Sequence, residues 1–402
     1  MGLQMVDSKR PFERLPTGNH GFEPVVTIEL PDDTEGGCFR KYQLKRRMLM
    51  KMTTMRRITV AVFGMVMTSA FATASEVYVD ARNGCDCKAG TTEAPVKTIS
   101  KAYSLLRGKE GSQDAGGTIY LYPGTYLADK PIFLTPPSEA SDATLTIEAV
   151  KLPGEKDWKP EDMPVLLTGS WQGDLGIPGG EVFTSIFVVQ RNNVAIRGLK
   201  FLGYHQPNSR YIPIIRIQSE LNNLKVEQCM FVANIDVPIQ VGILADGSGI
   251  QVDHCVFYNA RNSVVFWRKG AASAKTGNRL AYCIVYGAYQ SGVWTALEDE
   301  GFEFRNNVIT KCRFAWIRNG DNHSDYKAEN CVILDNEYEQ GVAFTEDVVP
   351  EDFGLECINV KKEGTLEFGT VDEVDDPVPH DYLHLVPGSF GSELGAGLFV
   401  KD

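Results

Sequence analysis

The sequence VEQCMF at residues 226–231 is one of a series of short apolar stretches that carry a small or polar residue at their centre. Related stretches follow as VDHCVF at 252–257, LAYCIV at 280–285, FRNNVI at 304–309 and AENCVI at 328–333. With an earlier member at Gly198 and a later one at Cys357, the repeated positions are 198, 229, 255, 283, 307, 331 and 357, which lie 24 to 31 residues apart. Similarity at a nearly fixed period is typical of repeat architectures.

Each repeat contains a second apolar strand about ten residues after the first. These second strands are expected at 264–267, 292–297, 315–318 and 342–345. They are rich in Val, aromatic and other strand-forming residues, and units this short must stack on their neighbours to bury an apolar face. A period near 25 residues suits one coil of three short strands. The sequence therefore predicts an all-β fold, a parallel β-solenoid in a single domain.

Five cysteines occupy the repeated positions: Cys229, Cys255, Cys283, Cys331 and Cys357. In an exported chain they could form disulfides. Asn307 occupies the same position in its repeat, however, which favours a ladder of free small residues stacked from coil to coil. Metal binding is disfavoured because no paired Cys/His spacing accompanies them. Cys85 and Cys87 lie apart from the ladder, in a Gly-rich loop, where they could pair with each other, bind a metal or only shape the loop.

Residues 55–74 have the three-part layout of a secretory signal peptide. Basic Arg56 and Arg57 precede an apolar run at 58–71, and the small-x-small sequence ATA ends it at 72–74. A single membrane anchor is the alternative, but the run is shorter than the ~20 residues that a span needs. Residues 1–54 are then a leader or a mis-assigned start, and 75–402 form the domain. We expect a secreted or periplasmic protein that leaves the membrane once the signal is cleaved.

The composition of the 402-residue chain is that of a globular protein. It is 43% apolar and 23% charged, with a formal net charge of −12. An acidic chain lacks the general positive charge with which nucleic-acid-binding proteins contact phosphates, so a nucleic-acid partner is not expected.

The two ends of the proposed domain have a recognisable sequence. Residues 77–84 read VYVDARNG, with AGTTEAPVKTI at 89–99, GTIYLYPGTY at 117–126 and DYLHLVPGS at 381–389. These segments resemble the pectate-lyase-like superfamily of secreted right-handed parallel β-helix proteins. The resemblance implies a right-handed β-helix over 76–402 with a short capping helix at 100–107. It also implies that a polysaccharide binds along the sheet formed by the second strand of each repeat.

Aromatic residues recur on those second strands. Aligning the coils places Trp267, Trp294 and Trp316 side by side, and Phe344 extends the row. In residues 314–318, strand alternation puts Ala315 and Ile317 inside and the other three residues outside. An outward row of Trp side chains suits stacking on sugar rings, whereas an inward row would be an interior aromatic stack.

Charged residues gather where these strands end. The candidate catalytic residues are Arg268, Lys269, Glu298, Asp299, Arg318, Asp321 and His323. In β-elimination of a uronate polysaccharide, Lys, Arg or His removes the proton beside the carboxylate, and a second cation or Ca²⁺ stabilises the resulting charge. Hydrolysis instead needs two carboxyl groups on either side of the scissile bond. Solvated turns with no catalytic role are the third interpretation.

Asp253 lies in the sequence VDHC at 252–255, which is similar to a short pectate-lyase motif whose Asp lies near a catalytic Ca²⁺. A carboxylate at this place could bind Ca²⁺. The Arg-x-Pro-x-x-Arg motif of those enzymes is missing downstream, as are the paired-Asp and Gly-His-Gly motifs of polygalacturonases. A cofactor is therefore not required by the sequence, and Ca²⁺ stays a candidate.

The resemblance and the charged residues together predict a secreted, monomeric protein that acts on an acidic polysaccharide, with lyase chemistry as the leading hypothesis. A glycoside hydrolase on the same scaffold is the first alternative. A non-catalytic glycan-binding or surface β-helix is the second.

Overall fold

The computed structural model describes residues 76–107, 116–135, 142–169, 183–205, 210–268, 276–296, 298–344, 347–369 and 384–399. All of them belong to one compact unit, Ser69–Asp402. The expected leader and signal peptide, residues 1–54 and 55–74, lie outside the described residues. Within the described ranges, no helix is long and apolar enough to cross a membrane.

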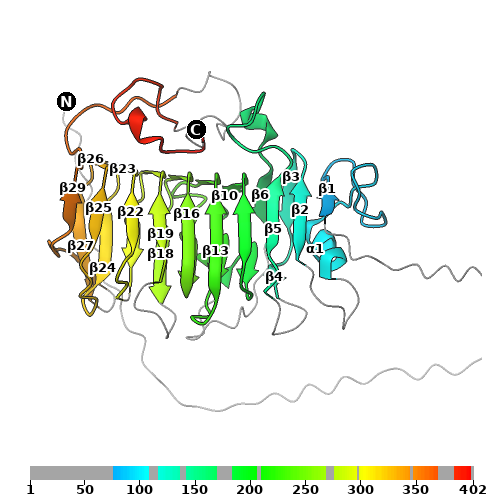
Figure 1. The fold of residues 1–402 in the computed structure, drawn as a ribbon, viewed down its shortest axis with the longest axis horizontal. Helices are drawn as coiled ribbons and strands as arrows, with labels where there is room; N and C mark the ends of the chain where they lie inside the picture. Colours follow the sequence, from blue (N-terminus) through cyan, green and yellow to red (C-terminus); the bar gives the residue numbers. More distant parts are fainter. Residues whose placement is uncertain are drawn as a thin grey trace, which may run out of the picture. The chain divides into compact units, whose positions relative to one another are not determined.

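The described strands form three long sheets, which we call A, B and C, and one small sheet (Figure 1). Sheet A contains β1 (Glu76–Val79), β2 (Gly117–Leu121), β5 (Leu145–Ala149), β9 (Val194–Arg197), β13 (Asn222–Glu227), β16 (Ser248–Asp253), β19 (Arg279–Ala281), β22 (Glu303–Arg305), β25 (Lys327–Glu329) and β29 (Glu356–Ile358). Sheet B contains β3 (Thr125–Ala128), β6 (Val165–Thr168), β10 (Lys200–Leu202), β14 (Met230–Val232), β17 (Val256–Tyr258), β20 (Ile284–Tyr286), β23 (Val308–Thr310) and β26 (Val332–Leu334). Sheet C contains β4 (Ile132–Leu134), β8 (Phe187–Val189), β12 (Ile214–Arg216), β15 (Val241–Asp246), β18 (Asn262–Arg268), β21 (Ser291–Thr295), β24 (Phe314–Asn319), β27 (Tyr338–Phe344) and β28 (Asp347–Pro350). The small sheet pairs β7 (Phe183–Thr184) with β11 (Arg210–Tyr211).

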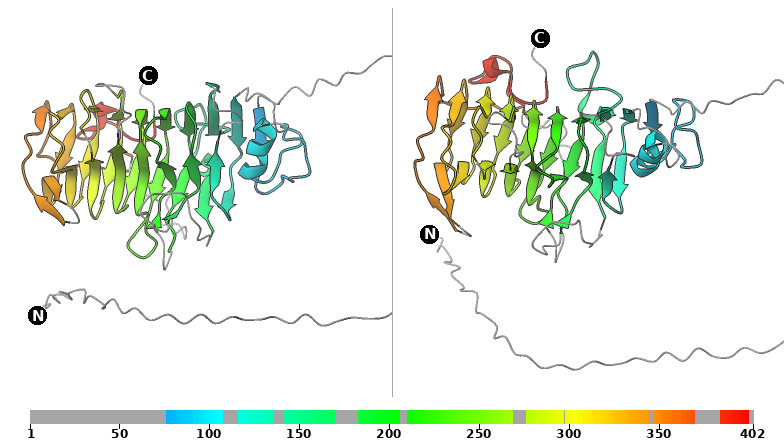
Figure 2. Two further views of the ribbon diagram at one scale, coloured as in Figure 1. Left: turned by 90° about the horizontal axis from the view of Figure 1, so that it is seen from below. Right: turned by 60° about the horizontal axis from the view of Figure 1, so that its bottom comes forward.

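The chain visits the three sheets in turn, so that β13, β14 and β15 form one coil and β16, β17 and β18 form the next. Neighbouring coils pair in parallel, as in the match of Val226 with Val252 in sheet A and of Phe231 with Phe257 in sheet B. Figure 2 shows the coils following one another in chain order. Only β28 pairs antiparallel among the described strands, where it folds back on β27. The expected parallel β-helix is confirmed, and the second strands of the repeats lie in sheet C as β18, β21, β24 and β27.

The corner between sheets A and B carries the small-residue ladder. Cys229, Cys255 and Cys283 are fully buried, and the thiol of each donates to the carbonyl two residues earlier, at sulfur–oxygen distances of 3.2 to 3.3 Å. Burial raises the pKa of the Cys229 and Cys255 thiols well above the usual value, so both stay protonated donors. In the next coil, Asn307 donates to Leu280 O at 2.9 Å and accepts from Cys283 N at 2.9 Å.

The residue before each ladder position makes the corner. These residues have a left-handed backbone, with φ between 51° and 67°, and they are Gly198, Gln228, His254, Tyr282, Asn306 and Asn330. Left-handed geometry is uncommon outside Gly, and Asn is among the residues that tolerate it best. A single left-handed residue changes the chain direction enough to begin the strand of the next sheet. For this reason the repeat has no long turn at this corner.

The structure corrects two members of the expected ladder. Lys200 pairs with Met230, so Leu199 rather than Gly198 stacks on Cys229, while Gly198 is the corner residue before it. Cys357 pairs with Ala328 inside sheet A and is exposed, so it lies two residues before the corner of its own coil. That coil turns at Asn359, and Val360 packs against the interior in the ladder position.

The cysteines at the ladder are not bridged. Cys229, Cys255, Cys283 and Cys331 are free and buried, as is Cys312 at a different corner. This confirms the free ladder for those four positions. Cys85 and Cys87 are joined by a disulfide within their loop, which selects one of the three roles that the sequence left open.

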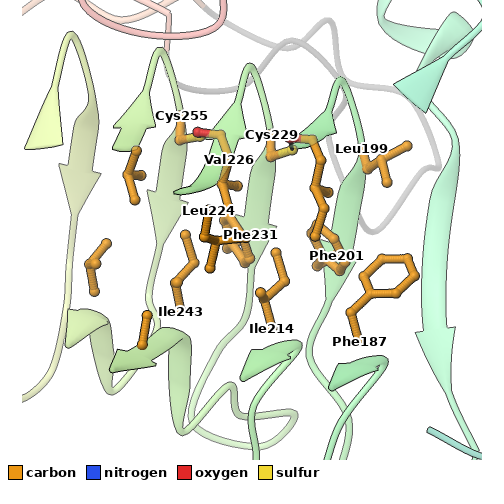
Figure 3. Packing of buried hydrophobic residues seen from close by; sticks show 14 of the residues in the cluster. Phe187, Leu199, Phe201, Ile214, Leu224, Val226, Cys229, Phe231, Ile243 and Cys255 are labelled. Atoms are coloured by element: carbon orange, nitrogen blue, oxygen red, sulfur yellow. Dashed lines mark hydrogen bonds between the residues drawn. The ribbon is translucent and has the colours of Figure 1, made fainter. Parts of the chain in front are cut away.

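The interior of the coils is apolar and stacked. Phe201 and Phe231 lie one above the other (Figure 3), and Phe257 stacks on Phe231, with ring centroids 4.9 and 4.6 Å apart and nearly parallel planes. Successive coils are about 4.8 Å apart, so identical side chains in register stack face to face. Each aromatic pair adds about 0.5–1.5 kcal/mol beyond the burial of its area.

Two segments cover surfaces that the coils leave open. At the start of the solenoid, α1 (Ile99–Arg107) contacts β1 and β2 and buries Ile99, Ala102, Tyr103 and Leu106, as expected for the capping helix (Figure 1). Near the C-terminus, Leu385, Leu394 and Leu398 pack on the outer side chains of sheet B. Leu394 ends the short η2 helix (Ser392–Leu394), and Leu398 follows it. One other short helix, η1 (Pro160–Asp162), precedes β6 in the described residues.

Candidate functional site

The outer face of sheet C, where a polysaccharide groove was expected, is largely apolar and covered. Val188, Ile215 and Val265 occupy one outward row along the sheet and are at most 2% exposed. They form a separate apolar cluster with Phe183 and Ile212. The face over β8, β12 and β18 is therefore closed, whereas Trp294, which pairs with Val265 and continues the same row, is only partly buried.

A pair of adjacent tryptophans lies toward the ends of β18 and β21. Trp267 is 40% exposed, and Trp294 is partly buried beside it with ring centroids 6.2 Å apart and planes at 66°. The indole Nε1 of Trp294 donates to Asn319 Oδ1 at 2.8 Å, which fixes the orientation of that ring. We call Trp267, Trp294 and Asn319 the tryptophan rim. Two of the expected sugar-stacking residues are thus brought together at the surface.

The expected outward position of Trp316 is wrong. Trp316 is 1% exposed and packs inside the coil against Phe304 and Tyr326, with its Nε1 donating to Thr295 Oγ1 at 3.0 Å. It pairs with Val293, whereas Trp294 pairs with the outward Ile317. The simple alternation failed because Ala315 and Trp316 both face the interior, which moves every later residue of β24 to the opposite side.

Phe344 is exposed, but it lies at a different place along the strands. Asn319 pairs with Ala343, so Phe344 lies beside Gly320, and a Cβ on that glycine would come within 2.4 Å of the Phe344 ring. The ring of Phe344, at the end of β27, therefore packs over Gly320 and does not continue the outward row that contains Trp294.

Arg318 points into the structure rather than out of it. It pairs with Thr295, which is buried, and its guanidinium lies over the ring of Phe353 with Cζ 5.0 Å from the centroid. Its Nε is buried and makes no hydrogen bond with any described residue. The corrected register of β24 explains this position, and it removes Arg318 from the outward set of expected cations.

Asp299 is part of a buried polar network at the corner between sheets C and A. Its carboxylate accepts from Thr276 Oγ1 and from Asn278 Nδ2 at 2.8 Å, and its backbone N–H donates to Ser324 Oγ at 2.8 Å. At 4% exposure it is held by three turns of successive coils. Buried carboxylates of this kind need such partners to offset desolvation. The arrangement gives Asp299 an architectural role.

The remaining expected catalytic residues are exposed or outside the description. Glu298, Asp321 and His323 lie on the turns after β21 and β24 and are exposed. Arg268 ends β18, and its side chain is not described; Lys269 lies outside the described residues. Acidic and basic groups thus follow the strands that carry the tryptophan rim.

Asp253 has a partner that competes with a metal. Both of its oxygens accept from Arg279, one from Nε at 2.9 Å and the other from a terminal guanidinium nitrogen. Among the described residues, no group of three or more His, Cys, Asp or Glu is placed to hold a metal ion. The Asp253 carboxylate therefore acts as one half of a cross-strand ion pair on sheet A, and its residues do not fit a Ca²⁺ site.

The sequence analysis missed the corner between sheets B and C. Arg261, Tyr289, Arg313 and Glu337 occupy equivalent places there in four successive coils. Each lies six residues after a ladder position, at Cys255, Cys283, Asn307 and Cys331. This constant offset is a signal that the sequence contained. A shallow hollow of about 650 Å³ lies over this corner, lined in part by Tyr289, Lys311 and Arg313.

A second hollow, of about 510 Å³, opens at the first coil beside the start of α1. Its walls include Ile99, Tyr126 and Leu166, with Lys97 and Lys130 among the polar lining residues. It lies in the part of the solenoid that precedes all of the expected catalytic residues in the chain.

Comparison with known proteins identifies no family. No family model matches the chain, and no curated protein matches it. Among solved structures, a rhamnogalacturonan lyase is similar at 14% sequence identity, over 81% of this chain and 100% of the other, with a TM-score of 0.41.

Proposed function

We propose that this chain is an exported β-helix that binds an acidic polysaccharide at the tryptophan rim and cleaves it by β-elimination. The observation that carries the proposal is the adjacent pair of the exposed Trp267 and the partly buried Trp294 toward the ends of β18 and β21. Apolar residues close the same face over β8, β12 and β18, so a bound glycan would contact mainly this rim and the adjoining turns.

The rim has the physical properties of a sugar-binding surface. Large aromatic faces offer apolar area to the C–H groups of a sugar ring, and an indole that is held in place loses little conformational entropy on binding. The hydrogen bond from Trp294 to Asn319 supplies this preorganisation. Single apolar side chains are common on protein surfaces and do not indicate a binding site. Two adjacent tryptophans on neighbouring strands form an apolar patch, which is typical of a ligand-binding surface.

The turns beside the rim provide groups for the proposed reaction. The imidazole of His323 would take the proton from the carbon next to the uronate carboxylate. The electrons of that C–H bond would form a carbon–carbon double bond as the glycosidic C–O bond breaks, and the departing oxygen would take up a proton from solvent. Arg268 and Lys269 are the proposed cations that stabilise the charge on the uronate during this step.

Glycan binding without cleavage is the second candidate function. It is favoured by the engagement of two expected catalytic residues in the scaffold, since Asp299 is hydrogen-bonded by Thr276 and Asn278 and Arg318 packs on Phe353. Hydrolysis would have to use the exposed carboxylates of Glu298 and Asp321.

The test is incubation of the purified chain with acidic and neutral polysaccharides, with and without added Ca²⁺. We expect ultraviolet absorbance from unsaturated uronates to rise together with new reducing ends. His323→Ala should lower the rate by about 100-fold, the usual contribution of a general base, and Trp267→Ala should weaken binding. Lys327→Gln, on the outer face of sheet A, is the matched control.

Each other outcome has a definite meaning. Reducing ends without absorbance would replace elimination by hydrolysis and would direct attention to Glu298 and Asp321. Binding that depends on Trp267 without any turnover would establish the second candidate. Absence of both binding and turnover across the panel would overturn the proposed function.

A further inference from the structure

The corner between sheets B and C has the same backbone in consecutive coils. Asn259, Gly287, Lys311 and Asp335 all have positive φ, between 53° and 70°. The residue after each of the first three is buried: Ala260, Ala288 and Cys312. Because strand-like chain alternates its side chains, the residue after that one faces outward.

The outward residues are stacked in register by the backbone. Tyr289 N donates to Ala260 O at 3.2 Å, and Arg313 N donates to Ala288 O at 2.9 Å. Successive coils are about 4.8 Å apart. Arg261 and Arg313 therefore lie about 10 Å apart along the solenoid, with Tyr289 between them. We call Arg261, Tyr289 and Arg313 the basic edge.

Neighbouring groups orient the side chains of this edge. Arg261 Nε donates to Gln290 Oε1 at 2.7 Å, and the same oxygen accepts from Asn262 Nδ2 at 3.1 Å. The Arg313 guanidinium lies over the Phe314 ring, with Cζ 5.4 Å from the centroid. Tyr289 is 37% exposed. The edge thus offers a cation, an accessible aromatic ring and a second cation in a line.

The acidic neighbours of the edge do not neutralise it strongly. Lys311 pairs with Asp335 at 2.8 Å, and Arg313 Nε is 4.0 Å from Glu337 Oε2. All four of these side chains are more than half exposed. Exposed ion pairs contribute about 0–1 kcal/mol, so a polymeric anion can replace the carboxylate beside Arg313. The hollow of about 650 Å³ beside Tyr289, Lys311 and Arg313, which Asp335 and Glu337 also line, gives such a ligand space at the Arg313 end of the edge.

We propose that the basic edge is a second glycan-binding surface, selective for polysaccharides in which anionic and uncharged sugars alternate. One sugar of an extended glycan has a length similar to the rise of one coil, so the two arginines match carboxylates on every second sugar. Guanidinium groups bind carboxylates through paired hydrogen bonds, and the Tyr289 ring would stack on the uncharged sugar between them. The inference takes from the proposed function only that the ligand is a polysaccharide.

The experiment compares soluble oligosaccharides of equal length by titration calorimetry on the full chain. One has alternating uronate and neutral sugars, one contains only uronate, and one is neutral. We expect the alternating ligand to bind about ten times more tightly than the other two, and the advantage to shrink in high salt because the contacts are charged. The double variant Arg261→Gln/Arg313→Gln and the variant Tyr289→Ala should each lose this preference.

Two controls make the outcomes distinct. Lys327→Gln removes an exposed cation on sheet A and should leave the preference unchanged, and the unfolding midpoint of each variant reports whether it folds. If Arg313→Gln and the double variant keep the wild-type preference, or if the wild-type chain binds all three ligands equally, the inference is overturned.

The rim variant separates the two proposals. Trp267→Ala should leave the preference for the alternating ligand intact, because the tryptophan rim lies at the opposite ends of the sheet C strands. Loss of cleavage in Trp267→Ala with no effect of the edge variants would support the proposed function and contradict this inference. Loss of binding in the edge variants alone would support the inference and contradict the rim as the binding site.

Discussion

The corner between sheets A and B and the corner between sheets B and C have the same backbone geometry but differ in what their side chains do. Each turns the chain through a left-handed residue and stacks the turn on the coil before it. At the first corner, the ladder position is inside and holds Cys or Asn in the central coils. At the second, the outward position holds Arg, Tyr, Arg and Glu in turn, of which Arg261 is partly buried and the other three are exposed.

The difference between the corners follows from burial. A fully buried position must be small and must satisfy the polar backbone groups of the turn, so few residue types fit it. An outward position on the same backbone has no such constraint, and its side chains are free to serve a ligand. Buried positions that repeat the same residue types therefore belong to the scaffold, and outward positions whose residue type varies from coil to coil are candidate binding surfaces.

The largest effect on stability is expected at the buried corner. Asn307→Ala would leave Cys283 N–H and Leu280 C=O buried without the partners they have in the wild type. Each loss costs about 1–3 kcal/mol, so we expect the free energy of unfolding to fall by about 2–4 kcal/mol. Denaturant titration followed by circular dichroism measures it.

Asn307→Cys is the matched control for that substitution. In the preceding coil, Cys255 N already donates to Cys283 Sγ at 3.4 Å, so a cysteine at 307 should restore part of the lost stability. Equal losses for Ala and Cys would contradict the view that Cys and Asn are equivalent members of one ladder.

A smaller loss is expected at the third corner, between sheets C and A. Asp299→Asn would present an amide group where the carboxylate now accepts from Thr276 and Asn278, and we expect a loss of about 1–3 kcal/mol. The adjacent exposed Glu298→Gln should change stability by less than ~0.5 kcal/mol. A variant of Asp299 that keeps full stability but loses activity would show that its role is catalytic instead.

The exposed corner should tolerate substitution. Arg313→Gln breaks a contact of 4.0 Å to Glu337 between two side chains that are each more than half exposed. We expect a change of less than ~1 kcal/mol in the free energy of unfolding, smaller still at high salt. A loss as large as that of Asn307→Ala would mean that the basic edge is part of the scaffold rather than a free surface.

The smallest effect is a pH dependence at the outer side of the first corner. Burial lowers the pKa of His254, whose ring stacks on Tyr282 beside Asp253 and Arg279, with the Asp253 charge opposing the shift and the Arg279 charge adding to it. The folded state thus favours neutral imidazole, and the unfolded state binds the proton first as the pH falls. This contribution to the free energy of unfolding is present above the unfolded-state pKa of about 6.5. It is lost as the pH falls below that value and through the lower pKa of the folded state.

His254→Asn removes this titration while keeping a residue that accepts the φ of 51°. We expect the free energy of unfolding to fall less steeply for the variant than for the wild type between pH 7 and pH 5. Parallel curves for the two proteins would contradict the assignment.

The expected site was harder to predict than the fold. Two of the aromatic residues, Trp267 and Trp294, are at the surface as expected, whereas Trp316 is inside. The error arose where two consecutive residues, Ala315 and Trp316, face the interior, because any departure from alternation reverses every later side chain of the strand. Asp299 and Arg318 were expected to be catalytic from their charge and their place at the strand ends, and neither property reports burial.

The sequence by itself determined the coil period, the parallel solenoid, the helix at the first coil and the free ladder at four cysteines. The period, the solenoid and the ladder follow from local spacing, because each coil buries its apolar residues only by repeating the pattern of its neighbour. The helix was expected from the resemblance of the N-terminal residues to known β-helix proteins. Tertiary structure alone decided the one-residue shift from Gly198 to Leu199, the exposure of Cys357 and the inward position of Trp316. Those features depend on register between coils and on which segments cover each face, and such contacts between residues distant in the chain leave no periodic signal in the sequence.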